Sequence, residues 1–210
     1  TVYKFDESPA DAIKVLSQLS QSVQIEFSKS ESDMFEDAKD GKFDNISFAE
    51  ASLLSSGVHD PEKRKQYLLR VDALHLQVVR RTSNAASAFE KGRILLEVLH
   101  ADPLRNGYRE NQTDVSQILN NQTFNCVSSA TLYNILARRL GLDARGIEVP
   151  DHAFSILYDG TKHVDIETTT RAGFNPARNK AALEQFQRQT GFVYIPDRNR
   201  SHRREIGEPG

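Results

Sequence analysis

The stretch Asn125–Gly141, NCVSSATLYNILARRLG, carries the clearest structural signal in this chain of 210 residues. Asn125 is a residue type that favours the position before a helix, because its side-chain oxygen accepts hydrogen bonds from N–H groups of the first turn. Gly141 follows two arginines and a leucine, an arrangement typical of the end of a helix. The stretch therefore predicts a helix whose first residue is Cys126.

Cys126 is the only cysteine of the chain, so no internal disulfide can form. A thiol at the start of a helix lies where the helix dipole and unpaired N–H groups stabilise an anion, which lowers its pKa. Most lone cysteines are simply small buried side chains. The position at the helix start nevertheless makes Cys126 a candidate nucleophile, which we expect to be partly exposed.

The pattern of apolar residues changes on the two sides of Gly141. Before it, capping residues and apolar stripes predict a helix near the N-terminus, a charged loop over 28–45, a helix after Ser47, a long helix from Pro61 and another over 84–99. After it, alternating apolar residues predict short strands, followed by a helix over 176–189 and a last strand over 192–195. The expected fold class is therefore α+β, with a helical N-terminal region and a small antiparallel sheet.

Asp159-Gly160 is a dipeptide typical of the two-residue turn of a β-hairpin. It lies between two predicted strands, one that begins near His152 and one that runs from Lys162 to Thr168. If the loop has two residues, Tyr158 pairs with Thr161, and the same register places His152 opposite Glu167. The turn therefore predicts a carboxylate beside an imidazole.

Cys126, His152 and Glu167 together fit the logic of a catalytic triad, in which an acid orients a histidine that serves a nucleophile. Asp165 lies on the same strand face as Glu167 and is the other candidate acid, one diagonal step from His152. Taken alone, a single histidine is more often structural than catalytic.

The order of three motifs resembles the bacterial transglutaminase-like superfamily. These are Phe124-Asn125-Cys126-Val127-Ser128-Ser129-Ala130, then Pro150-Asp151-His152-Ala153-Phe154, then Val164-Asp165-Ile166-Glu167-Thr168-Thr169. The family core is a cysteine-bearing helix packed on an antiparallel sheet that carries the histidine and the acid. The family acid usually precedes Pro-Thr at the end of its strand, and Glu167 before Thr168 matches that position.

The resemblance implies a thiol-dependent acyl enzyme without a cofactor, acting on a protein or peptide substrate. Cys126 would attack a carboxamide or peptide carbonyl, His152 would move the proton and Glu167 would orient His152. Release to water gives an amidase or protease, and release to an amine gives a transglutaminase. For the oxyanion hole, the Cys126 N–H and one of Gln122, Asn121 or Asn125 are the candidates. The alternative is an interaction domain that keeps this fold without catalysis.

The resemblance also divides the chain. We expect an N-terminal helix and charged loop over 1–45, a transglutaminase-like domain over 46–195 and a polar basic tail over 196–210, which can lead into a further segment. Within the domain, 46–120 is the helical part and 120–175 the catalytic core. Because the first residue is Thr1, a preceding segment can have been removed, and the sequence indicates no compartment.

Composition excludes several other classes of function. The chain has 27 basic and 29 acidic residues, a net charge of −2, and its arginine-rich end lacks interleaved aromatic residues, so no nucleic-acid partner is expected. No apolar run approaches the length of a membrane span. His163, Asp165 and Glu167 share a strand face, but no second cluster supplies further ligands, so no metal is expected.

Overall fold

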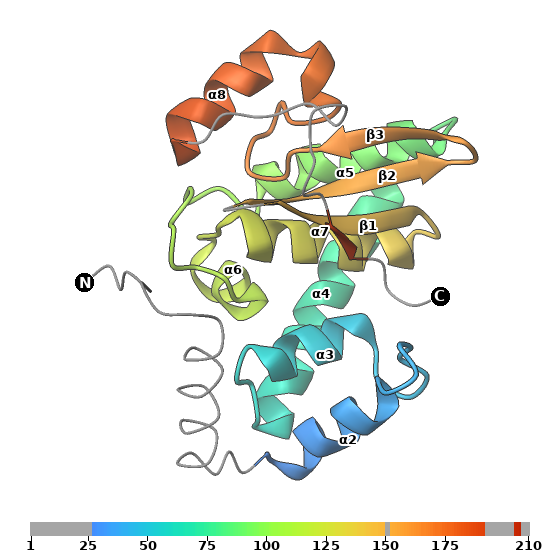
Figure 1. Ribbon diagram of the computed structural model, residues 1–210, viewed down its shortest axis with the longest axis vertical. Coiled ribbons are helices and arrows are strands. Elements are labelled where there is room, and N and C mark those ends of the chain that lie inside the picture. Colours follow the sequence, from blue (N-terminus) through green and yellow to red (C-terminus); the bar gives the residue numbers. More distant parts are fainter. Residues whose placement is uncertain (1–26, 150–151, 192–203, 207–210) are drawn as a thin grey trace, which may run out of the picture.

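The computed structural model describes residues 27–149, 152–191 and 204–206 of the chain (Figure 1). Helices fill the first part and a sheet follows, so the expected α+β class is confirmed. The helices are α2 (Lys29–Asp37), α3 (Phe48–Ser55), α4 (Pro61–Thr82), α5 (Ala88–Ala101), α6 (Val115–Asn121), α7 (Cys126–Arg139) and α8 (Lys180–Thr190). The strands are β1 (Asp143–Val149), β2 (His152–Asp159), β3 (Lys162–Ile166) and β4 (Arg204–Ile206), and the 3-10 turn η1 (Pro176–Arg178) precedes α8.

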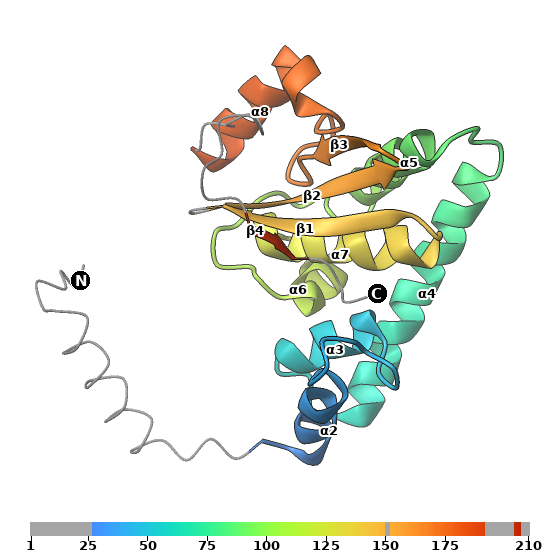
Figure 2. The ribbon, with the colours of Figure 1, turned by 45° about the vertical axis from the view of Figure 1, so that its right-hand side comes forward.

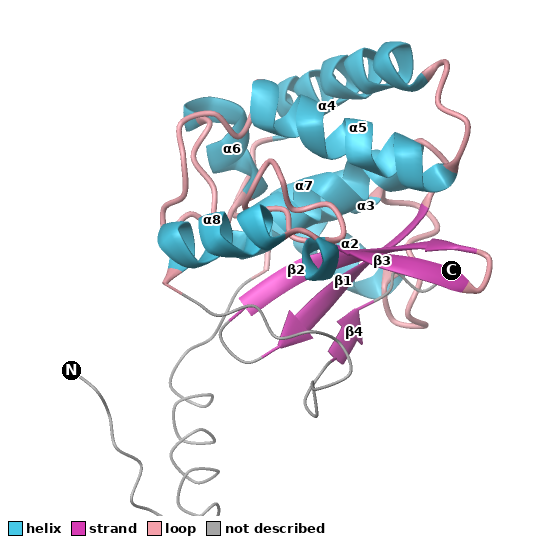
Figure 3. Ribbon diagram, turned by 90° about the horizontal axis from the view of Figure 1, so that it is seen from above, coloured by secondary structure: helices cyan, strands magenta, loops and turns pink. Residues whose placement is uncertain are grey.

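The sheet is antiparallel, with the strand order β3-β2-β1-β4 (Figure 2). Helices α7 and α5 pack against it, and α4 packs on both of these helices. Figure 3 shows these three helices together on one side of the sheet. The main core lies between α7 and the sheet, so the helix that begins with Cys126 is fixed in the centre of the fold.

The Asn125–Gly141 stretch folds as its capping residues predict. The Asn125 side-chain oxygen accepts hydrogen bonds from the N–H groups of Val127 and Ser128, at 3.0 and 3.1 Å, and the Ser128 hydroxyl accepts one from the Asn125 N–H. At the other end, Gly141 has φ +71°, a conformation that glycine adopts without strain. The cap therefore determines that Cys126 is the first helical residue.

Close packing between α5, α7 and β2 depends on Gly92 of α5. A Cβ atom at this position would lie 2.4 Å from Leu157 Cδ2 of β2 and 2.8 Å from the Tyr133 hydroxyl of α7. The Tyr133 hydroxyl donates a hydrogen bond to the Gly92 carbonyl at 3.2 Å, and both Tyr133 and Leu157 are fully buried. A glycine is needed here because three elements meet without room for a side chain.

The register predicted for the β2–β3 hairpin is wrong by one pair. Asp159 pairs with Lys162 and Tyr158 with His163, so the two-residue loop is Gly160-Thr161. Gly160 occupies the first loop position with φ +60°, a conformation that glycine adopts readily because it has no side chain. As a result, Glu167 lies just beyond the end of β3 rather than in a pair with His152.

Two further expectations for the N- and C-terminal parts need correction. Residues 29–37, expected within a charged loop, form α2, because Ser28 and Glu31 make a reciprocal capping box and Met34 packs on α3. Residues 204–206 of the expected polar tail form β4, which pairs with β1. The expected helix near the N-terminus and the strand at 192–195 lie outside the described residues.

Candidate active site

Three elements bring Cys126, His152 and Glu167 to one end of the sheet. Cys126 is the first residue of α7, His152 is the first residue of β2, and Glu167 directly follows β3. Because β2 and β3 run in opposite directions, the start of one lies beside the end of the other, and Figure 1 shows the start of α7 at the same end. The three residues named from the sequence are therefore neighbours in space.

Glu167 and His152 form a buried pair. His152 Nε2–H donates a hydrogen bond to Glu167 Oε2 at 2.7 Å, and the two side chains are 8% and 1% exposed. The other carboxylate oxygen, Oε1, accepts from the Thr169 hydroxyl at 2.7 Å and from the Thr169 N–H at 3.2 Å. The expected contact is thus present although the strand register differs, because the chain turns after β3 and directs Glu167 back toward His152.

The loop that carries Glu167 is held from within by a tight turn. The Glu167 N–H donates to the Gly173 carbonyl at 2.8 Å, and a Cβ atom at Gly173 would lie 1.9 Å from the Glu167 carbonyl oxygen. Only glycine fits this contact, because any side chain would overlap the backbone of the acid. Gly173 therefore fixes where Glu167 leaves the strand.

The same loop is also held against α5 and α7 through Thr168. His100 Nε2–H, at the end of α5, donates to the Thr168 carbonyl at 3.0 Å, and the Thr168 and Ser129 hydroxyls are 2.8 Å apart. Burial lowers the pKa of His100 to about 4, so its ring is neutral and donates a single N–H. Ser129 lies one turn after Cys126, and it therefore ties the acid loop to the helix of the thiol.

Cys126 is buried, with 8% exposure, and not partly exposed as expected. Its sulfur lies among polar groups: interactions with the His152 side chain and the Ala153 N–H lower the pKa of the thiol, and the sulfur in turn raises the pKa of the Tyr108 hydroxyl. Because Glu167 engages Nε2 of His152, proton exchange with the thiol falls to Nδ1. The thiol is therefore both buried and in a polar environment.

The electrostatics of the pair favour a thiolate beside an imidazolium. Burial raises the pKa of the Cys126 thiol, but the hydrogen bond and charge of His152 and the Ala153 N–H outweigh it, and the pKa falls below its ordinary value. For His152, burial lowers the pKa, while the hydrogen bonds to Cys126 and Glu167 raise it to about 9. Each charge thus stabilises the other.

Two phenylalanines cover the His152 ring. Phe154 of β2 stacks on it, with ring centroids 6.1 Å apart and planes inclined by 16°, and Phe186 of α8 lies closer, at 4.9 Å and 58°. Phe186 is 1% exposed, and next to it Gln185 accepts a hydrogen bond from the Thr170 hydroxyl at 2.6 Å. Helix α8 therefore covers the histidine and is attached to the acid loop.

A comparison with known protein families assigns this part of the chain to a family. The family model of the transglutaminase-like superfamily matches residues 65–177, which is more than half of the chain and includes Cys126, His152 and Glu167. The chain belongs to the transglutaminase-like superfamily. A solved structure described as the crystal structure of a TGase is similar at 17% identity with a TM-score of 0.40, over 55% of this chain and 36% of that structure. The chain thus spans about a third of that protein, and no curated protein matches.

Asn125 and Gln122, named above for the oxyanion hole, and Asp165, the other candidate acid, are also the residues that the sequence offers for binding substrate. Asn125 caps α7, and its Nδ2 donates to the Glu110 carbonyl at 2.9 Å. Gln122 accepts from Arg105 Nε at 2.7 Å and donates to Asp102 at 3.2 Å. Asp165 is buried within β3, opposite Ile156. The role of these three residues in binding stays a prediction.

Sequence reasoning missed several residues of the site. Tyr108, Thr169, Ser129, His100 and Phe186 all contact the triad or the loop of its acid. Of these, Thr169 and Ser129 stand within the motifs of the acid and of the cysteine. Tyr108, His100 and Phe186 lie outside the motifs, where no local sequence pattern predicts their contacts.

The described part of the chain shows neither a metal site nor a helix that could span a membrane. No group of three or more histidine, cysteine or acidic side chains gathers there in a way that could hold a metal ion. None of the described helices combines the length and apolar character that crossing a membrane requires.

Proposed function

We propose that this protein catalyses thiol-dependent acyl transfer or amide hydrolysis, with Cys126 as nucleophile, His152 as general base and acid, and Glu167 as the residue that orients His152. The observation that carries this proposal is the position of the His152 ring, between the Cys126 sulfur and the Glu167 carboxylate. The lowered pKa of Cys126 and the raised pKa of His152 support it, because the thiolate is the reactive form of a cysteine.

The reaction proceeds through a thioester. The Cys126 thiolate attacks the carbonyl carbon of a carboxamide or peptide bond, forming the S–C bond while the carbonyl electron pair moves to oxygen. The carbonyl then re-forms, the C–N bond breaks, and the departing amine takes the proton of the His152 imidazolium. Neutral His152 next removes a proton from water or from an amine, whose oxygen or nitrogen attacks the thioester and releases Cys126.

The acceptor decides whether the enzyme is a hydrolase or a transglutaminase. Water yields the free acid, and a primary amine yields a new amide bond. The buried thiol and the cover of His152 by Phe186 restrict the approach of water, a condition under which an amine can compete as acceptor. The substrate would be a protein or peptide that presents a carbonyl to this recessed sulfur.

The test is to trap the acyl enzyme. The protein is incubated with a library of glutamine-containing peptides and with p-nitrophenyl acetate, and the adduct is located by intact mass and peptide mapping. We expect a thioester on Cys126 that is absent in Cys126→Ser and that decays faster when a labelled primary amine is added. A folded protein whose thiol reacts with iodoacetamide but never accepts an acyl group would instead favour a non-catalytic interaction domain.

A further inference from the structure

When Cys126 attacks a carbonyl, the oxyanion that forms needs hydrogen-bond donors. The contacts near the start of α7 show which of the candidate donors are already engaged. At the start of α7, Asn125 takes the N–H groups of Val127 and Ser128, and the Ser129 N–H donates to the Asn125 carbonyl. The cap therefore uses the first-turn donors other than the Cys126 N–H. Asn125 and Gln122 are engaged elsewhere, and Asn121 is exposed and donates to Gln117.

Tyr108 is the polar side chain that reaches the sulfur from outside the triad. The segment 106–109 runs alongside 122–124: the Asn106 N–H donates to the Gln122 carbonyl at 3.0 Å and the Arg109 N–H to the Phe124 carbonyl at 2.7 Å. Tyr108 itself forms a parallel bridge with Phe124, two residues before Cys126. Its hydroxyl lies near enough to the Cys126 sulfur for the charge and hydrogen bonding of the thiolate to raise the pKa of the tyrosine.

The position of Tyr108 is fixed by a contact of its ring and by hydrogen bonds of the residues that follow it. The ring packs edge-on against Phe124, with centroids 6.3 Å apart, and Phe124 is buried in the main core. After Tyr108, the Glu110 and Gln112 carbonyls accept hydrogen bonds from the Asn125 and Ser128 side chains, at 2.9 and 2.6 Å. The loop is therefore attached to the start of α7, and the tyrosine is held in place before any substrate binds.

We propose that the Tyr108 hydroxyl, together with the Cys126 N–H, forms the oxyanion hole of the reaction proposed above, on which this inference rests. In the resting site the hydroxyl donates to the thiolate. When the S–C bond forms, the negative charge leaves the sulfur for the carbonyl oxygen, which is bonded to the carbon next to it. The hydroxyl then donates to that oxygen, and it returns to the sulfur when the thioester is released.

The chemistry of the hydroxyl suits this role. Burial and the neighbouring Cys126 charge raise the pKa of Tyr108 to about 12, so the hydroxyl keeps its proton over the whole range in which the thiol reacts. A donor held in place beside a developing charge contributes most, since it needs no rearrangement during the reaction. Tyr108 would then be a catalytic residue that the sequence motifs do not contain.

The test compares two reagents in Tyr108→Phe, a change that removes only the hydroxyl. Iodoacetamide alkylates the thiolate by direct displacement and forms no oxyanion, whereas p-nitrophenyl acetate acylates it through a tetrahedral oxyanion. We expect the ratio of acylation to alkylation rates to fall by about 10²-fold, the order found when one oxyanion donor is removed. Because both reactions need the thiolate, the ratio cancels any change in thiol pKa.

Tyr133→Phe is the matched control, because it also removes a buried hydroxyl from a tyrosine, in this case on α7 itself. It should lower stability and leave the ratio unchanged. Equal changes in the acylation and alkylation rates of Tyr108→Phe would overturn the inference, because Tyr108 would then act only on the thiolate. A rise in both rates would also overturn it, because Tyr108 would then only restrict access to the sulfur. Wild-type protein that is alkylated but not acylated would contradict the proposed function itself, a result distinct from an unchanged ratio.

Discussion

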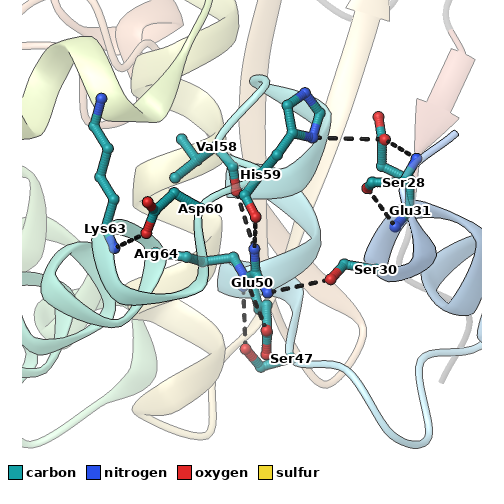
Figure 4. A network of polar contacts seen from close by, with 10 residues as sticks. All are labelled: Ser28, Ser30, Glu31, Ser47, Glu50, Val58, His59, Asp60, Lys63 and Arg64. Carbon is teal, nitrogen blue, oxygen red and sulfur yellow. Dashed lines mark hydrogen bonds and ion pairs between the residues drawn. The ribbon is translucent and has the colours of Figure 1, made fainter.

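The Arg64–Glu50 pair of the helical region and the His152–Glu167 pair at the end of the sheet each place a buried basic group against a carboxylate. The nitrogen-to-oxygen distance is 3.1 Å in the first pair and 2.7 Å in the second. Figure 4 shows the surroundings of Arg64: it donates also to the carbonyls of Val58 and His59, both at 3.1 Å. His152 instead meets the Cys126 thiol.

The two pairs differ in what else the basic side chain contacts: backbone carbonyls for Arg64 and a thiol for His152. Backbone carbonyls cannot change their charge, so Arg64 holds α3, α4 and the loop between them in one arrangement. A thiol can exchange a proton with an imidazole, so His152 and Cys126 form a pair of charges that can carry out chemistry. A buried ion pair is thus structural or reactive according to what else its basic group contacts.

The change with the largest expected effect removes the acid of the reactive pair. In Glu167→Gln the acyl-transfer rate should fall by about 10⁴-fold, the order seen when the orienting acid of a related triad is neutralised. Asp165→Asn, a buried acid two residues away on the same chain segment, is the matched control and should lose at least about tenfold less activity. Steady-state acylation rates check this, and equal losses in the two variants would contradict the assignment of Glu167.

Removal of the imidazole should break the ion pair. The pKa of Cys126 lies below its ordinary value, so the wild-type thiol stays reactive as the pH falls below about 8.5, the usual cysteine pKa. In His152→Ala the thiol loses its largest favourable partner, and alkylation at pH 6 should fall by about 100-fold. The pH–rate profile with iodoacetamide measures this shift.

The upper limb of the pH–rate profile of acyl transfer, measured separately from alkylation, tests the other charge. His152 has its pKa raised to about 9, so the imidazolium is present below that pH and is lost as the pH rises through it. Acyl transfer in the wild-type protein should therefore decline above about pH 9, because the departing amine needs the His152 proton. Identical alkylation profiles for wild type and His152→Ala would contradict the ion pair.

The corresponding change in the helical region should affect stability and leave chemistry alone. Arg64→Ala leaves Glu50 and two carbonyls without their donor, and we expect the free energy of unfolding to fall by about 2 kcal/mol, because carbonyls lose a charged donor while Glu50 is partly exposed. Urea denaturation measures this loss. The rate of Cys126 alkylation in the folded variant should equal that of the wild type, and a changed rate would show that the two regions are coupled.

The smallest expected effect concerns access to the site. Phe186 is the only α8 side chain found buried among those that the structure describes, so α8 is attached over His152 by few apolar contacts. Phe186→Ala should raise the rate at which a bulky maleimide labels Cys126 by about tenfold, through more frequent local opening. Gln187→Ala, an exposed position on the same helix, is the control. A maleimide rate unchanged by Phe186→Ala would show that α8 does not limit access.

Local signals predicted much of the fold. Asn125 and Gly141 bounded α7 correctly, because capping depends on residues that are neighbours in the chain. The same physics placed the start of the long helix at Pro61, after Asp60. The hairpin register could not be predicted, because Asp159-Gly160 and Gly160-Thr161 both fit a two-residue turn and the packing of β3 chooses between them.

By itself, the sequence determined which groups can react and which elements carry them: a cysteine at a helix start, a histidine at a strand start and an acid before threonine. Only the tertiary structure decided that Glu167 reaches His152 from beyond the strand, that Tyr108 reaches the sulfur and that Phe186 covers the histidine. The reason is that capping and alternation act between neighbours in the chain, whereas these contacts join segments whose approach depends on the packing of the whole core.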